Sequence, residues 1–216
     1  MSFIPKVLII AGSDSGGGAG IQADIKTTSY FNGYAMTAIT AVTAQNTIGV
    51  QSIYPLPKEI VMEQINSITT DLSPDIVKIG MLADLDIIEY ISKKISNYKI
   101  VLDPVMVATS GDVLVSDEVV SSIKNNLINK SFLITPNIYE AEILSENKIN
   151  CLEDQIEAGK NLLKLGCKHV LVKGGHGNSD IINDVLITSS GDEYIFESKK
   201  IISKNTHGTG CSLASA

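Results

Sequence analysis

The sequence has 216 residues, of which 44% are hydrophobic and 5% aromatic, so it holds enough apolar material to bury the core of a single α/β domain. Its formal net charge of −7 offers no basic surface, which argues against a nucleic acid or an anionic membrane as a partner. The sequence has no leader and no apolar run long enough to span a bilayer, so we expect a cytoplasmic protein with small-molecule ligands.

The three cysteines favour a reducing compartment. Cys151, Cys167 and Cys211 are an odd number, and their spacings match neither a disulfide framework nor a zinc site. Two of them are expected to be plain core or surface thiols.

The first predicted strand leads into an unusual loop. The apolar run over residues 6–11 predicts a strand buried on both faces, as in a parallel sheet, and it stops at Gly12. The glycine-dense loop 12–20 then opens a helix whose apolar face is predicted to carry Ile21, Ile25 and Thr28. The loop is no Rossmann fingerprint, which needs glycines at the first, third and sixth places, and it lacks the Lys-Ser/Thr of a P-loop.

Two polar side chains near the first two strands are candidate ligand groups. Asp24, one turn into the first helix, could accept hydrogen bonds from a ligand above the sheet or simply complement the helix dipole. Residues 34–44 and 50–54 are predicted strands, and Gln45 follows the first of them. An amide both donates and accepts, as a ring with an amino or hydroxyl substituent requires, although Gln45 could equally be an ordinary turn residue.

From residue 58 onward the pattern alternates between helix and strand. Amphipathic spacing predicts helices over residues 59–70, 85–95 and 117–127, and apolar runs predict strands over residues 75–79, 99–102 and 131–135. Leu85, Ile88, Ile91 and Ile95 are expected along one face of the second helix. Such repetition indicates crossover units and a mostly parallel sheet, with ligands at the carboxyl ends of its strands. Asp103 lies at such an end, and residues 108–112 are a predicted loop.

Further candidates follow in the second half of the chain. Residues 137–140 open a helix, and Glu140 in its first turn could satisfy the helix dipole or bind Mg²⁺, which takes few carboxylates and leaves other positions to water and phosphate. A helix over 152–165 and a strand over 168–172 precede Lys173, which can reach a phosphate lying over the adjoining glycines. His176 is expected to be a loop residue, and residues 181–188 and 193–198 predict a β-hairpin.

The stretch 203–213 carries the most specific chemistry. Gly208 and Gly210 leave backbone N–H groups uncovered at the start of a predicted helix, which favours an anion there. At this helix start the thiol of Cys211 is predicted to ionise more readily than a free one. The alternative is a glycine-rich turn with a buried cysteine. Because the helix begins so near residue 216, we expect the single domain to lack a C-terminal segment of the natural protein.

Seven stretches in register resemble one family over essentially the whole chain. They are residues 12–27, 43–47, 78–81, 103–106, 135–137, 173–176 and 206–211. Together they closely resemble the hydroxymethylpyrimidine/phosphomethylpyrimidine kinases of thiamine biosynthesis, in the ribokinase-like superfamily. The resemblance implies a three-layer α/β sandwich, with helices on both faces of a mostly parallel sheet and a late β-hairpin.

The resemblance also implies an activity and a site. It implies ATP-dependent phosphorylation of 4-amino-5-hydroxymethyl-2-methylpyrimidine to its monophosphate and then to the diphosphate, with Mg²⁺, in a homodimer; it leaves open a need for a monovalent cation. The implied pyrimidine pocket contains Gly12, Asp24, Gln45, Met81 and Val107. The implied metal ligands are Asp103 and Glu140, and the nucleotide contacts are Asn137, Lys173, Thr206 and Gly208. The implied catalytic group consists of Lys173, Gly208, Gly210 and Cys211.

Two departures from the family leave alternatives open. Many members have Pro or Ser where this chain has Ser15 and Gly16, and some have Glu in place of Gln45, which bears on ring specificity. The family also takes part of its adenine pocket from residues beyond the last predicted helix. The alternatives are a pyridoxal or pyridoxine kinase, which phosphorylates a similar hydroxymethyl group, and a non-catalytic protein that binds the pyrimidine.

Overall fold

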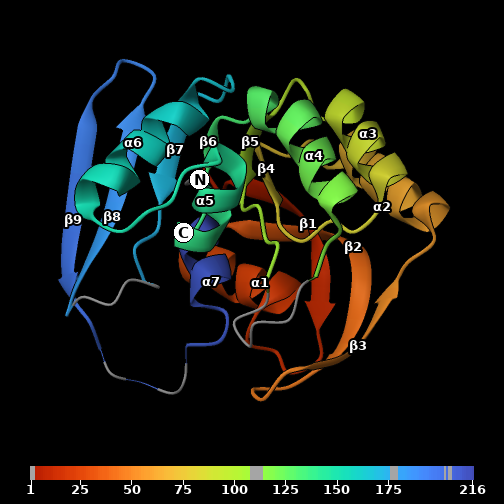
Figure 1. Cartoon of the computed structure of the whole chain (residues 1–216). Helices are drawn as coiled ribbons and strands as arrows, with labels where there is room; N and C mark the ends of the chain where they lie inside the picture. The colour runs from red at the N-terminus through yellow and green to blue at the C-terminus, as the bar shows by residue number, and fades with distance from the viewer. Residues whose placement is uncertain (1–2, 108–113, 176–179, 202, 204–205) are drawn as a thin grey trace.

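The computed structural model describes residues 3–107, 114–175, 180–201, 203 and 206–216. These residues form three layers, with helices on both faces of one nine-stranded sheet (Figure 1). The strands lie in the order β3 (Val50–Pro55), β2 (Tyr34–Gln45), β1 (Lys6–Asp14), β4 (Ile76–Ile79), β5 (Lys99–Leu102), β6 (Leu133–Ile134), β7 (His169–Val172), β8 (Ile181–Thr188) and β9 (Glu193–Lys199).

The sheet is parallel in its centre and antiparallel at its edges. Six adjacent strands run parallel, in the order β2, β1, β4, β5, β6 and β7. At one edge β3 pairs antiparallel with β2, and at the other β8 and β9 form the late antiparallel hairpin beside β7. The carboxyl ends of the six parallel strands therefore meet at one edge of the sheet, where α/β proteins bind their ligands.

The helices divide unequally between the two faces. The main hydrophobic core lies between one face of the sheet and α2 (Lys58–Asp71), α3 (Leu85–Lys94), α4 (Asp117–Asn126), α5 (Ile138–Ser145) and α6 (Leu152–Leu163). A short 3₁₀ turn, η1 (Ile128–Lys130), follows α4. On the opposite face, α1 (Gly20–Tyr30) packs through Ile21 on Ile9 and Ala11 of β1. Beside it lies α7 (Thr209–Ser215), so the first and last helices are neighbours (Figure 1).

The predicted alternation of strands and helices is confirmed, with differences at particular residues. Strand β1 continues past Gly12 to Asp14, because a register shift lets Ser13 and Asp14 keep pairing with β2. The predicted strand 131–135 is reduced to Leu133–Ile134.

Two predicted core residues are exposed. Ile25 is 36% exposed because α1 turns Ile21, Asp24 and Thr28 inward instead. Leu85 is 46% exposed because it is the first residue of α3, ahead of the turns that pack into the core. The predicted loop 108–112 and His176 lie outside the described residues. No helix among the described residues is both long and apolar enough to cross a membrane.

Candidate active site

Three of the charged candidates meet at the carboxyl ends of β5, β6 and β7. Asp103 directly follows β5, Lys173 directly follows β7, and Glu140 lies in the first turn of α5, which comes after β6. Lys173 Nζ donates to Asp103 Oδ1 at 2.8 Å, and Thr135 Oγ1 donates to the same oxygen at 3.0 Å. All four side chains are buried, so this edge of the sheet holds an acid–base cluster shielded from bulk water.

Burial and charge shape the protonation of this cluster. Burial alone would lower the pKa of Lys173, but the attraction of Asp103 and Glu140 outweighs it and raises this pKa, so the lysine is charged at neutral pH. Burial, opposed by Lys173 and assisted by the charge of Asp103, raises the pKa of Glu140 to about 7. Near neutral pH, Glu140 is therefore present in both its protonated and its ionised form, and a bound cation would favour the ionised form.

Glu140 also has a structural role. Its backbone N–H donates to Asn137 Oδ1 at 3.0 Å, and its Oε2 accepts from the Asn137 N–H at 2.8 Å, which completes a capping box at the start of α5. The side chain of Asn137 is thus engaged in capping. The assignments of Glu140 to a metal and of Asn137 to a nucleotide stay predictions.

The turn before α7 leads into a helix start that lies beside Lys173. Gly208 caps α7 with a φ of +81°, a left-handed conformation that favours glycine. A Cβ added at Gly210 would lie 3.2 Å from Lys173 Nζ, so the backbone of the first helical turn passes directly beside the lysine. Thr206 lies in this turn, where its carbonyl accepts from Thr209 N–H and Oγ1. The predicted juxtaposition of a lysine and a glycine-rich helix start is therefore present.

The prediction that Cys211 ionises easily is wrong for this structure. Burial of the thiol, together with the carboxylates of Asp103 and Asp24, raises its pKa to about 11, although Lys78 and a hydrogen bond from Gly20 act in the opposite direction. Two acids and the loss of water outweigh the partial charge of a helix start. The thiol is therefore neutral at pH 7.

Asp24 lies at the centre of a buried ion pair that the sequence analysis missed. Lys78 Nζ, from the middle of β4, donates to Asp24 Oδ1 and Oδ2 at 2.8 and 2.9 Å, and Ser215 Oγ in α7 donates to Oδ1 at 2.7 Å. Burial raises the pKa of Asp24 above its ordinary value, although the charge of Lys78 and the three hydrogen bonds from Lys78 and Ser215 act in the opposite direction. A lysine inside a four-residue apolar strand was the available signal, because a buried charge needs a partner.

The remaining pocket candidates lie around the ends of β1 and β2. A Cβ on Gly12 would come within 2.9 Å of Met81 Cε, so these two residues are in contact. Gln45 ends β2, and its Oε1 accepts from Thr43 Oγ1 at 3.0 Å. Val107 packs against the main core. The binding of a ring by Gly12, Asp24, Gln45, Met81 and Val107 stays a prediction.

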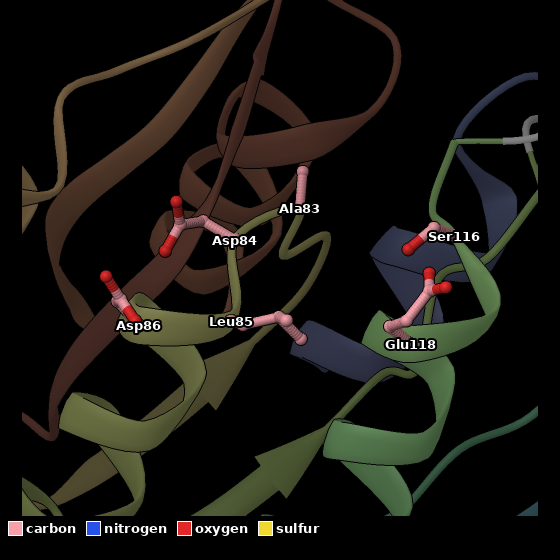
Figure 2. Close-up of a pocket in the computed structure, with 6 residues that line it drawn as sticks. All are labelled: Ala83, Asp84, Leu85, Asp86, Ser116 and Glu118. Carbon is pink, nitrogen blue, oxygen red and sulfur yellow. The ribbon is translucent and has the colours of Figure 1, made fainter.

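A separate surface hollow lies between the first turns of α3 and α4 (Figure 2). It has a volume of about 460 Å³, and its acids already have partners. Asp84 caps α3 by accepting a hydrogen bond from the Ile87 N–H at 2.9 Å. Asp86 forms an ion pair with Lys58, and Glu118 forms a hydrogen bond with the side chain of Ser116. Within the described part of the chain no cluster of three or more His, Cys, Asp or Glu could by itself hold a metal ion.

Comparison with solved structures defines the class. The chain superposes on a Bacillus subtilis pyridoxal kinase, solved as an ADP complex, with a TM-score of 0.90 and 36% identity, over 99% of this chain and 82% of that one. It matches a phosphomethylpyrimidine kinase from Clostridium difficile with a TM-score of 0.82 and 39% identity, over 98% and 91%. The sheet and the two helical layers are those of a ribokinase-like small-molecule kinase.

Sequence comparison gives the family within that class. The phosphomethylpyrimidine kinase family matches residues 14–216. A hydroxymethylpyrimidine/phosphomethylpyrimidine kinase from Bacillus subtilis is 48% identical over 99% of this chain and 80% of its own length. The chain belongs to the phosphomethylpyrimidine kinase family.

Proposed function

We propose that this kinase transfers the γ-phosphoryl group of ATP to the hydroxymethyl group of 4-amino-5-hydroxymethyl-2-methylpyrimidine, and then phosphorylates the monophosphate to the diphosphate for thiamine biosynthesis. The observation that carries the proposal is the position of the charged Lys173 beside the start of α7. A Cβ added at Gly210 would lie 3.2 Å from Lys173 Nζ. Phosphoryl transfer requires positioning and charge stabilisation more than covalent chemistry, and a lysine beside the glycine-rich start of a helix supplies both.

The acids fit Mg²⁺ as the accompanying ion. Asp103 and Glu140 offer only oxygen donors, and two carboxylates are what Mg²⁺ takes when water and phosphate complete its shell. A Glu140 that loses its proton near pH 7 is suited to gain a cation. We infer that these two residues hold the ion, which would neutralise phosphate charge when bound, while Lys173 compensates charge at the migrating group. The resemblance leaves open whether the kinase also needs a monovalent cation.

The pyrimidine would lie beyond the ends of β1, β2 and β4. Gly12 and Met81 offer an apolar wall, and Gln45 offers an amide that donates and accepts. Asp24 would act on the ring through its charge and not through a direct hydrogen bond, because its oxygens already accept from Lys78 and Ser215. Val107 is the remaining candidate of this pocket.

The direct test is incubation with ATP, Mg²⁺ and the pyrimidine alcohol, followed by mass measurement of the products. We expect the monophosphate and then the diphosphate, with ADP formed in step. Lys173→Met is the matched control, because it removes the charge and keeps the apolar stem. Background ADP formation by the wild type would instead support a non-catalytic pyrimidine-binding protein.

A pyridoxal kinase is the second candidate, favoured by the structural similarity to a solved pyridoxal kinase. The same assay with pyridoxal in place of the pyrimidine distinguishes the two. A higher kcat/KM for pyridoxal would assign the chain to the second candidate, and a higher value for the pyrimidine to the first.

Assembly and location complete the proposal. We infer a homodimer in the cytoplasm; the three unpaired cysteines are consistent with a reducing compartment. Light scattering on the purified protein would report the oligomeric state, and fractionation of cells would report the location.

A further inference from the structure

The glycine-rich turn after β1 is held by one carboxylate. Asp14 Oδ1 accepts from Gly16 N–H at 2.7 Å, and Oδ2 accepts from Gly18 N–H at 3.0 Å and Ala19 N–H at 2.8 Å. Asp14 is buried at the end of β1. Three backbone donors on one side chain fix the path of a turn whose glycines would otherwise leave it free.

The same carboxylate reaches across to the turn before α7. His207 Nε2 lies 2.7 Å from Asp14 Oδ2, and the two residues are 193 positions apart in the sequence. Burial acts to raise the pKa of Asp14, but the hydrogen bonds from Ala19, His207 and Gly16 lower it below its ordinary value. An ionised carboxylate can only accept, so Nε2 of His207 carries the hydrogen.

The two turns are also in direct contact. A Cβ on Gly18 would come within 2.4 Å of His207 Cδ2, and a Cβ on Gly208 would come within 1.7 Å of the Gly18 carbonyl oxygen. Neither glycine has room for a side chain. The geometry of the turn before α7 therefore depends on the turn after β1. Gly210, which lies beside Lys173, follows Gly208 by two residues, so the position of Gly208 also affects the backbone beside the lysine.

We propose that Asp14 and His207 act as positioning residues, forming a latch that fixes the turn before α7 relative to the glycine-rich turn after β1. The latch holds Gly208 against Gly18 and so sets Gly210 beside Lys173. The proposal deepens the proposed function, because it concerns the same site. The latch joins the side of the site expected to hold the pyrimidine to the side expected to hold the phosphates.

Kinetics of four variants test the latch. Asp14→Asn replaces one carboxylate oxygen by an NH2 group, which donates and cannot accept. His207→Ala removes the donor, whereas His207→Gln keeps a donor nitrogen near the position of Nε2. We expect the first two to lower kcat by about 10- to 100-fold, the scale for a misplacement of about 1 Å. The Asp14→Asn/His207→Ala double variant should lose no more than either single variant, and His207→Gln should recover most of the loss. Additive losses, or His207→Gln as slow as His207→Ala, would overturn the latch.

His169→Ala is the matched control for loss of an imidazole. His169 lies in β7, where its ring packs against Phe132, away from both turns. Its loss should lower thermal stability and leave kcat close to the wild-type value. A kcat loss in His169→Ala as large as in His207→Ala would show that destabilisation alone explains the effect and would overturn the proposal.

Hydrogen–deuterium exchange tests the latch without any activity. In His207→Ala we expect faster exchange of the amides of residues 16–19, and in Asp14→Asn faster exchange of residues 206–211. If each variant loosens only its own turn, the latch does not exist. A wild type that lacks kinase activity but shows the reciprocal exchange would instead refute the proposed function and leave the latch standing.

Discussion

Lys78 carries a positive charge into a part of the molecule that water does not reach, because its neighbours Val77 and Ile79 pack into the main core. Burial would lower the pKa of Lys78, but the attraction of the Asp24 and Asp103 carboxylates raises it, so the side chain stays charged. Removing one member of a buried pair leaves the other without compensation. The pair is therefore a point where one substitution has a large effect on stability.

We expect Lys78→Met to lower the free energy of unfolding by about 3–5 kcal/mol, and the Lys78→Met/Asp24→Asn double variant to lower it by less. Urea denaturation measures both. Lys93→Met is the matched control, since Lys93 pairs with Glu89 on the exposed face of α3 and should leave stability near the wild-type value. Equal losses for the single and double variants would mean that Asp24 does not depend on Lys78 for compensation.

Glu140 makes stability depend on pH. Its pKa rises from an ordinary value of 4.5 to about 7 in the folded chain, so between these values the folded state binds more protons than the unfolded state. Stability of the ligand-free protein therefore falls as pH rises from about 4.5 to 7, by on the order of 3 kcal/mol from this residue. Thermal unfolding without Mg²⁺ should show the decline, and Glu140→Gln should reduce it. An unchanged slope in Glu140→Gln would assign the decline to other groups.

Cys211 calls for a pH–rate profile, because its neutral thiol is a weak base at pH 7. If it takes the proton of the attacking hydroxyl, kcat should rise steadily with pH between 7 and 9, and Cys211→Ala should lose both the rise and about 10²–10⁴-fold in rate. Near-full turnover with an unchanged profile in Cys211→Ala would mean that the residue only packs beside the substrate. A low pKa was predicted wrongly because the sequence reveals neither the burial of the thiol nor how close Asp103 and Asp24 lie.

The elements were predicted more reliably than the contacts between them. Amphipathic spacing and strand ends located α3, β5, β7 and the β8–β9 hairpin almost to the residue, because local periodicity decides these elements. The cluster of Asp103, Glu140 and Lys173 also followed, since neighbouring parallel strands end at the same edge. The Asp24–Lys78 pair spans 54 residues, and no periodicity marks its partners.

Among the described glycines, Gly208 at the start of α7 leaves the least room for a methyl group. Gly208→Ala forces an alanine into a left-handed backbone conformation, and it also brings a Cβ to within 1.7 Å of the Gly18 carbonyl oxygen. We therefore expect a large loss of both stability and turnover. Gly191→Ala is the matched control: its φ is +88° and its Cβ would meet nothing within 4 Å. Gly191→Ala should cost only the conformational strain of about 1–2 kcal/mol, with turnover retained. Comparable losses of stability in denaturant would show that the Gly18 contact is unimportant.

At the scale of the whole molecule, one core joins the central strands to five helices. A continuous core favours all-or-none unfolding, so we propose that the chain behaves as a single domain. Circular dichroism in the far ultraviolet and the fluorescence of its seven tyrosines, in a chain without tryptophan, should change together in denaturant. Transitions with different midpoints would divide the molecule into two units.

Helix α7 is tied at both ends to the first 24 residues, through His207 to Asp14 and through Ser215 to Asp24, across separations of 193 and 191 residues. Closing loops of that length is slow, and a ribosome delivers Asp14 and Asp24 long before their partners in the turn and helix at residues 207–215. The sheet can pair strand by strand as it emerges, but the edge that carries Lys173 has to wait for α7. A nascent chain should thus remain without kinase activity until α7 has been synthesised.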